Sequence, residues 1–298
     1  MAEANDIKAH RRGFALTLFG VLVLTPDTLL MRLIDTDPWT MAFSRGLLMG
    51  CALLFIFIVV RRRHAMAEMR ALGLVGLAVA VIYAINSIAF VVAIEHTQVA
   101  NVLVILAAGP LFAGLMSVVF LREKVPGPTW AAIFTGIVGV AIVVSGGIQA
   151  GTGLGDLCAV VTALSLAAGF TIIRSMKTQN MIPATALGGL LVAAVTAPFA
   201  QPLLGSGGLG DTQLALTLLM GLVLLPISFG LITLGPRSVP APEVALLMLI
   251  EAVLGPFWVW WVIGEQPTPL TFIGGGVVLA AITLHAIWRR TQRAHVKV

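Results

Sequence analysis

Long apolar stretches alternate with short polar segments along almost the whole chain. Ten of these stretches are each roughly twenty residues long, the length at which an α-helix crosses a ~30 Å hydrocarbon core. Their expected bounds are Gly13–Ile34, Trp39–Val60, Ala71–Ile94, Val99–Leu121, Thr129–Ser145, Leu154–Ile173, Pro183–Ala200, Leu214–Leu234, Pro242–Ile263 and Leu270–Trp288. The pattern therefore predicts an all-α membrane protein with ten transmembrane helices and no separate soluble catalytic domain.

Composition points to the same class. Hydrophobic residues make up 59% of the chain and charged residues 10%, whereas an average soluble domain has about 25% charged residues. This balance argues against a large soluble enzyme and against a disordered chain. Both cysteines, Cys51 and Cys158, lie within apolar stretches, so we expect no disulfide bond.

The basic residues predict how the chain is oriented. If the N-terminus is cytoplasmic, the cytoplasmic segments contain every one of the 18 lysines and arginines except Arg32 and Arg45. Cytoplasmic loops are enriched in these residues, so we expect ten spans in an inner (plasma) membrane with both termini in the cytoplasm. The net charge of +5 then reflects orientation, and we expect no nucleic-acid partner. The basic N-terminal segment has no small-residue cleavage site after it, which favours a retained first span over a signal peptide.

Two segments that lie 142 residues apart, Val99–Trp130 and Ala241–Phe272, share an order of features. In each, an apolar helix runs into a glutamate, Glu123 or Glu265, and a threonine and then an aromatic residue follow. A repeat of five spans has an odd number of helices, so the second copy must be inverted in the membrane, as in many secondary transporters. The expected units are a cytoplasmic N-terminal segment 1–12, a first five-helix repeat 13–147, a second five-helix repeat 154–288, and a cytoplasmic tail 289–298.

Several short segments carry a resemblance to a known family. They are Phe43-Ser44-Arg45-Gly46, Ala108-Gly109-Pro110-Leu111-Phe112, Leu121-Arg122-Glu123-Lys124, Leu249-Ile250-Glu251-Ala252 and Ile263-Gly264-Glu265-Gln266. With these segments the chain resembles the drug/metabolite transporter superfamily, in its EamA-type branch, over almost its whole length. The family often has Glu-Pro where this chain has Glu251-Ala252. The resemblance implies transport of amino acids or related metabolites.

Three ionisable residues are expected deep in the membrane, where a charge costs about 2.5–3.5 kcal/mol on insertion scales. Asp27 and Arg45 each lie about seven residues from the outer end of their span, so their depths match at ~1.5 Å per residue. They form either a structural clamp between helices or an outer substrate site, in which Arg45 binds a carboxylate and Asp27 an amine. Glu251 is the deepest carboxylate. It could carry a coupling proton, bind a substrate amine, or serve as a packing residue.

Four further residues are candidates for the substrate cavity. Tyr83 and Asn86 lie in the third span, Asn101 near the outer end of the fourth, and Trp258 two helical turns beyond Glu251. The alternative for the first three is hydrogen bonding between helices. Trp258 could instead belong to the aromatic belt at the outer interface.

No phosphate-binding loop, metalloprotease motif or cluster of metal-ligand spacing occurs in the sequence, so we expect no nucleotide-driven pumping, no metal and no cofactor. The first hypothesis is a secondary active transporter that exports small metabolites by alternating access. Its partners would be the solute, a coupling proton or exchanged solute, and the lipid bilayer, with the protein a monomer or homodimer. The alternative is a membrane-embedded enzyme acting on a lipid or isoprenoid, which would need clustered acids or histidines at one membrane face. A third hypothesis, a scaffold that transports nothing, does not explain charged residues at depth.

Overall fold

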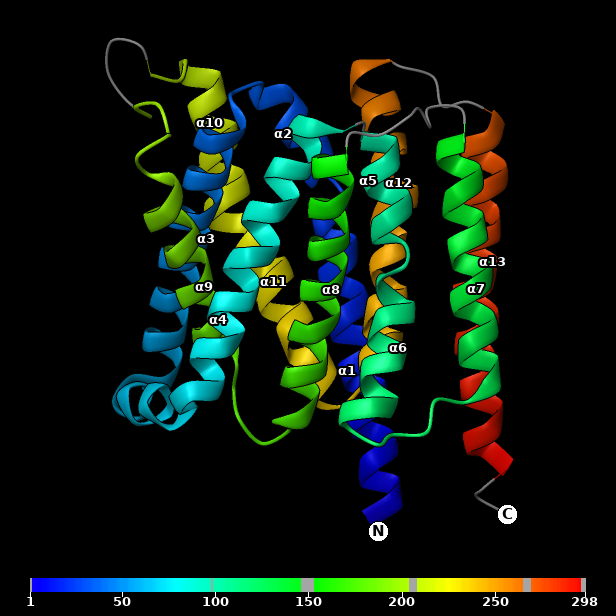
Figure 1. Cartoon of the computed structure of the whole chain (residues 1–298). Coiled ribbons are helices and arrows are strands. Elements are labelled where there is room, and N and C mark those ends of the chain that lie inside the picture. The colour runs from blue at the N-terminus through cyan, green and yellow to red at the C-terminus, as the bar shows by residue number, and fades with distance from the viewer. Residues whose placement is uncertain (1, 98, 146–152, 204–207, 265–268, 296–298) are drawn as a thin grey trace.

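The computed structural model describes residues 2–97, 99–145, 153–203, 208–264 and 269–295, and all regular structure in these ranges is helical (Figure 1). The longer helices, in chain order, are α1 (Ala2–Leu24), α2 (Asp27–Ile34), α3 (Pro38–Arg61), α4 (Ala65–His96), α5 (Val99–Leu106), α6 (Gly109–Phe120), α7 (Gly127–Val144), α8 (Gly153–Ser175), α9 (Ile182–Thr196), α10 (Asp211–Leu219), α11 (Leu225–Leu234), α12 (Ala241–Ile263) and α13 (Pro269–His295). Three short turns join them, namely η1 (Arg62–His64), the π-helical η3 (Met220–Leu224) and η4 (Gly235–Arg237).

Six helical stretches of the described chain are long and apolar enough to cross a membrane, and one of these, Pro38–His96, contains both α3 and α4. Shorter apolar helices cover Gly127–Ile142, Ile182–Thr196 and Phe272–Trp288. Large apolar side chains face outward from the bundle, such as Leu74, which is 84% exposed, and Trp261, which is 77% exposed. A surface this apolar is suited to lipid. The protein is therefore an all-helical membrane protein, and the count of ten spans stays a prediction.

Prolines interrupt three of the expected spans. The chain breaks between α1 and α2 at Pro26, α6 restarts with Pro110 at its N-terminus, and the π-helical η3 leads into α11 at Pro226. Proline has no backbone N–H and its ring crowds the preceding turn, so it ends or bends a helix. The residue 142 positions after Pro110 is Ala252, and α12 runs through it without a break.

The two halves of the chain run in opposite directions. In Figure 1, α1 begins at the end of the bundle where both chain termini lie, whereas α8 begins at the opposite end. Contacts between the halves come in equivalent sets: α1 packs on α11 as α8 packs on α4, and α6 packs on α8 as α12 packs on α1. The pairs α3–α9, α6–α12 and α7–α13 map onto themselves. A two-fold axis perpendicular to the spans produces this pattern of contacts.

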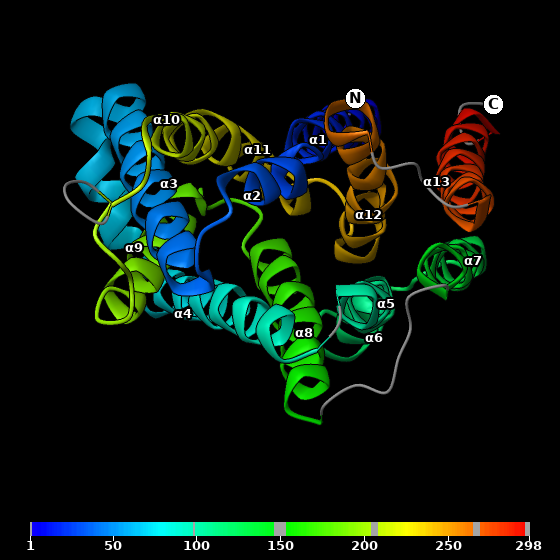
Figure 2. The ribbon, with the colours of Figure 1, turned by 90° about the horizontal axis from the view of Figure 1, so that it is seen from above.

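Helix α12 occupies the core of the bundle. Its residues Val244, Leu246, Leu247 and Val253 are almost completely buried and belong to the main apolar cluster. Seen from above, α7 and α13 form a pair at one side, while α3, α4, α9 and α10 lie at the other (Figure 2). Because α12 of the second half packs against α1 and α6 of the first half, side chains on this face of α12 lie between the two halves.

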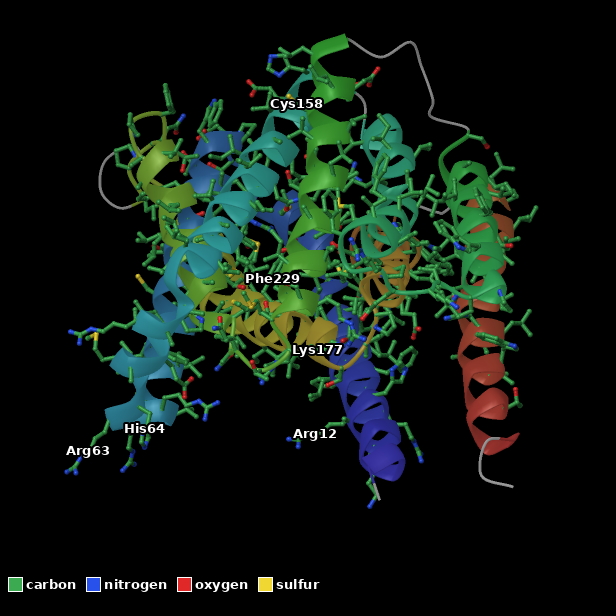
Figure 3. All side chains as sticks on the ribbon, turned by 60° about the horizontal axis from the view of Figure 1, so that its bottom comes forward. Arg12, Arg63, His64, Cys158, Lys177 and Phe229 are labelled. Carbon is green, nitrogen blue, oxygen red and sulfur yellow. The ribbon has the colours of Figure 1, made fainter. Side chains whose placement is uncertain are left out.

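The two ends of the bundle differ in the side chains that they present. Arg12, Arg63 and His64 lie at the end where the chain begins, and Cys158 lies near the opposite end (Figure 3). Arg63 and His64 belong to η1, which joins α3 to α4 and whose residues are exposed. The basic residues thus gather at the end that holds both termini.

Backbone contact between glycines holds α3 against α9. A Cβ atom added at Gly46 would lie 2.6 Å from the carbonyl oxygen of Gly189, and one at Gly50 would lie 2.9 Å from that of Ala186. Small residues allow such close approach in a membrane, where packing replaces the hydrophobic effect between helices. The α3–α9 contact, one of the pairs that map onto themselves, therefore depends on residues without a side chain.

We expect Gly46→Leu to destabilise the folded protein by about 1–3 kcal/mol or to prevent folding, because the new side chain must displace the α9 backbone. The measurement is thermal unfolding of purified protein in detergent. The matched control is Gly276→Ala in α13, where an added Cβ meets nothing within 4 Å; this change should leave the melting temperature equal or slightly higher. Equal melting temperatures for Gly46→Leu and the unmodified protein would contradict the packing described.

Candidate functional site

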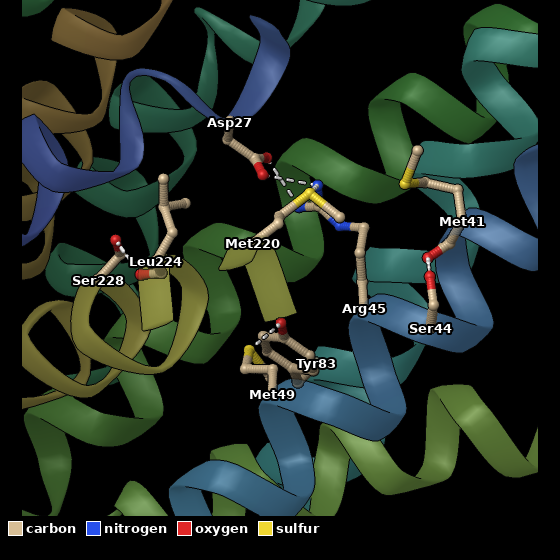
Figure 4. A network of polar contacts seen from close by, with 9 residues as sticks. All are labelled: Asp27, Met41, Ser44, Arg45, Met49, Tyr83, Met220, Leu224 and Ser228. Carbon is tan, nitrogen blue, oxygen red and sulfur yellow. Dashed lines mark hydrogen bonds and ion pairs between the residues drawn. The ribbon is translucent and has the colours of Figure 1, made fainter. Parts of the chain in front are cut away.

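A bidentate ion pair joins Asp27 and Arg45. Nη1 of Arg45 donates to Oδ1 of Asp27 at 2.7 Å, and Nη2 donates to Oδ2 at 2.8 Å (Figure 4). The side chain of Asp27 is 8% exposed and that of Arg45 is 19% exposed. Both oxygens of the carboxylate and both terminal nitrogens of the guanidinium are used, which is the strong planar geometry that arginine forms with an acid. The pair matches the equal depths expected from the sequence, while its role in binding stays a prediction.

Local structure brings these two residues together. Asp27 is the first residue of α2, directly after the break at Pro26, where the positive end of the helix dipole favours a carboxylate. A tight turn then reverses the chain: Asp35 adopts a left-handed conformation, with φ of 43°, and Asp37 accepts a hydrogen bond from the backbone N–H of Thr40 at 2.9 Å. Arg45 follows two turns into α3, antiparallel to α2, and faces Asp27.

Two residues from other helices complete the surroundings of Arg45. Nη1 also contacts Sδ of Met220 at 3.6 Å, which places the π-helical η3 of the second half against the pair. Tyr83 of α4 interacts electrostatically with both Arg45 and Asp27. Its hydroxyl donates to Sδ of Met49 at 3.4 Å, and its ring packs edge-on against Phe229 with centroids 5.6 Å apart. The network in Figure 4 therefore joins elements of both halves.

Glu251 adds a second carboxylate to the group. It lies in the middle of α12, is half-buried, and interacts electrostatically with both Asp27 and Arg45. Four of the residues expected from the sequence, Asp27, Arg45, Tyr83 and Glu251, thus form one cluster, which we call the central cluster. With two carboxylates and one guanidinium, it can offer partners to both ends of a zwitterion.

The remaining candidates lie elsewhere. Asn86 donates from Nδ2 to the carbonyl oxygen of Thr162 at 2.8 Å and so joins α4 to α8. Trp258 donates from Nε1 to Oγ1 of Thr25 at 2.8 Å, which ties α12 to the break beside Asp27. Asn101 lies in α5, but its side chain is outside the described part of the structure.

Sequence reasoning missed two residues that shape the cluster, Met220 and Thr25. Met220 resembles any apolar residue of a span, and the structure places it at the start of the π-helical η3, in contact with Arg45. Thr25 could have been found from the sequence, because it directly precedes Pro26, where a helix end is expected. In the structure its hydroxyl donates to the carbonyl oxygen of Leu22 at 2.8 Å.

The central cluster has no counterpart in the other copy. Positions related to these four residues by 142 residues carry no ionisable side chain. The charges of the cluster are therefore not repeated by the two-fold relation. The equivalents are Gly169 for Asp27, Leu187 for Arg45, Leu225 for Tyr83 and Gly109 for Glu251.

A model of the EamA-like transporter family matches residues 11–145 and again residues 153–287. The two matches begin 142 residues apart, the same offset that the sequence repeat has. One solved structure, described only as the crystal structure of a protein, has a TM-score of 0.79 to this chain at 14% identity, and the alignment covers 95% of this chain and 99% of the other.

At that identity the solved structure shows the fold alone. None of the curated proteins matches the sequence significantly. The family match covers nearly the whole chain in two copies, and it favours the transporter hypothesis over the membrane enzyme. The chain therefore belongs to the EamA-like transporter family of membrane proteins.

Proposed function

We propose that the protein is a secondary active transporter that moves small zwitterionic metabolites, such as amino acids or their derivatives, out of the cell by alternating access. The observation that carries this proposal is the central cluster, in which Asp27, Arg45 and Glu251 bring both signs of charge together between two inverted halves. Inverted repeats of this kind hold the substrate near the midplane, between the halves.

The orientation rests on charge. We propose ten spans with both termini in the cytoplasm of an inner-membrane protein, since Arg12, Arg63 and His64 gather at the end where the chain begins and cytoplasmic loops are enriched in basic residues. In this arrangement the α2–α3 turn faces outward. The Asp27–Arg45 pair then lies in the outer half of the membrane, and Glu251 lies near its middle.

The ion pair suggests how a solute would be recognised. The two terminal nitrogens of Arg45 are bonded to Asp27, so a solute carboxylate can take up this same bidentate geometry only by replacing the aspartate. The solute amine would then face the displaced Asp27 and Glu251. Such an exchange of partners keeps every charge compensated, which an apolar bundle requires. It also links binding to the relative position of α2 and α3.

Transport can be tested with purified protein in proteoliposomes and a panel of amino acids and derivatives. We expect counterflow or gradient-driven movement of at least one zwitterion. Exchange among labelled solutes identifies exchange as the driving force, and a response to an imposed pH gradient identifies proton coupling. Absence of movement for every solute tested, with folded protein in the vesicles, would contradict the proposal.

Glu251→Gln should reduce transport about tenfold or more while the protein remains folded, because a carboxylate that binds an ammonium group contributes about 1.5–3 kcal/mol. The measurement is the initial rate in proteoliposomes, together with the melting temperature. Glu95→Gln is the matched control, since Glu95 is exposed at the end of α4, and its rate should be unchanged. Equal rates for Glu251→Gln and the control would remove Glu251 from the site.

A double substitution separates a structural clamp from a binding site. Asp27→Asn alone leaves a buried arginine without its counter-ion and should destabilise the protein by about 3–5 kcal/mol. Asp27→Leu combined with Arg45→Met replaces the pair with apolar groups of similar volume and should restore the melting temperature, but not transport. If the double variant transports at the normal rate, the pair is a clamp only.

A further inference from the structure

A cavity of about 250 Å³ lies away from the central cluster, and among its lining residues are Ser117, Glu123, Thr129, Arg174 and Glu243. Its lining residues include Ser117 and Arg174, in the last turns of α6 and α8, and Glu243, in the first turn of α12. These helix ends lie at the end of the bundle where both termini lie (Figure 1). Its volume is below the ~300–1,000 Å³ of pockets for drug-sized ligands, so it suits a small metabolite.

Two hydroxyl groups in the cavity wall are buried without a hydrogen-bond partner among the described residues. Oγ of Ser117 and Oγ1 of Thr129 belong to side chains that are 0% and 1% exposed. Other buried threonines bond to their own helix, as Thr196 does to the carbonyl oxygen of Val192 at 2.8 Å. Buried polar groups are almost always paired. A polar ligand in the cavity would give these two hydroxyls a hydrogen-bond partner.

A buried carboxylate lies in the same wall. Glu243, in the first turn of α12, is 2% exposed, and its Oε2 lies 3.5 Å from Nε2 of His10. Nδ1 of His10 faces the carbonyl oxygen of Ser238 at 3.2 Å, which can only accept a hydrogen bond. Glu243 thus places a buried carboxylate in the cavity wall, beside His10.

Arg174, one of the two lysine or arginine residues of the wall, already has hydrogen-bond partners. Arg174 donates from Nε to Oε1 of Glu123 at 3.0 Å and from Nη1 to the carbonyl oxygens of Pro236 and Arg237 at 3.4 Å each. Lys124, which also lines the cavity, is exposed, so water screens its charge. An anion in the cavity would be repelled by the buried Glu243, whereas a cation would be attracted to it, so we expect the cavity to favour a cation.

We propose that this cavity binds the ammonium group of a small organic amine, with Glu243 as its counter-ion and the hydroxyl oxygens of Ser117 and Thr129 as acceptors. An ammonium group has three N–H donors, which match these three side chains. The identification of the bound amine as transported solute rests on the proposed function. In that case the cavity holds the amine end of the solute, at the end of the bundle where both termini lie, before the solute reaches the central cluster.

The test uses the full chain purified in detergent and n-butylammonium as the probe, with n-butanol and butyrate as neutral and anionic controls of similar shape. Calorimetry measures the affinity. We expect n-butylammonium alone to bind, Glu243→Gln to weaken it at least about tenfold, and Ser117→Ala and Thr129→Val to weaken it about three- to tenfold. Thr196→Val, a buried threonine outside the cavity, should bind as the unmodified protein does.

A second measurement separates binding from a merely structural role. Thr129→Val replaces an unpaired buried hydroxyl with a methyl group, so the ligand-free protein should melt at the same or a higher temperature while the affinity falls. A lower melting temperature with unchanged affinity would overturn the proposal. The proposal would also be overturned if all three cavity variants bound n-butylammonium with the affinity of the unmodified protein. Tighter binding of butyrate than of n-butylammonium, or no binding of n-butylammonium, would overturn it as well.

The two proposals fail in different ways. If n-butylammonium binds as expected but no solute moves in proteoliposomes, the binding site stands and the transport function fails. If solutes move normally and the cavity variants bind the probe as the unmodified protein does, the transport function stands and the cavity proposal is wrong.

Discussion

Hydrocarbon provides no partner for a charge or for a backbone N–H, and this constraint governs the whole molecule. It requires that the spanning segments be helices, and it requires that each ionised side chain at depth meet another. The bidentate pair of Asp27 and Arg45 meets this requirement with both side chains largely buried. Because the pair needs a helix break, a tight turn and an antiparallel neighbour, its formation fixes how α1, α2 and α3 are arranged.

The two-fold scaffold and the one-sided charge serve different purposes. Equivalent helix contacts in both copies make the scaffold of the two halves two-fold, the architecture of many secondary transporters. The charged residues of the central cluster are not repeated in the other copy. The positions related to Asp27, Arg45 and Glu251 are Gly169, Leu187 and Gly109. A symmetric frame thus holds a polar site that lies toward one end. The cavity near Glu243 adds a second polar place toward the other end.

Much of the fold could be predicted from the sequence, because span length, basic loops and the 142-residue offset are periodic or compositional signals. The pairing of Asp27 with Arg45 also followed from depth along two antiparallel helices. The contacts of Met220 and Trp258 could not be predicted, since they depend on how each helix is rotated about its axis. The cavity was missed for a related reason: Ser117 and Thr129 resemble packing residues, and Glu243 resembles an ordinary acid in a first helical turn.

The central claim is that the surroundings of Arg45 open alternately to the two sides of the membrane. The most direct measurement places a cysteine at Met220, which contacts Arg45, in a chain whose Cys51 and Cys158 are replaced by serine. A membrane-impermeant maleimide is then applied from one side or the other of oriented vesicles, with and without a transported solute. The account predicts labelling from both sides, with rates that shift in opposite directions when solute is added. Labelling from neither side, or from one side only and at a rate that solute does not change, would contradict it.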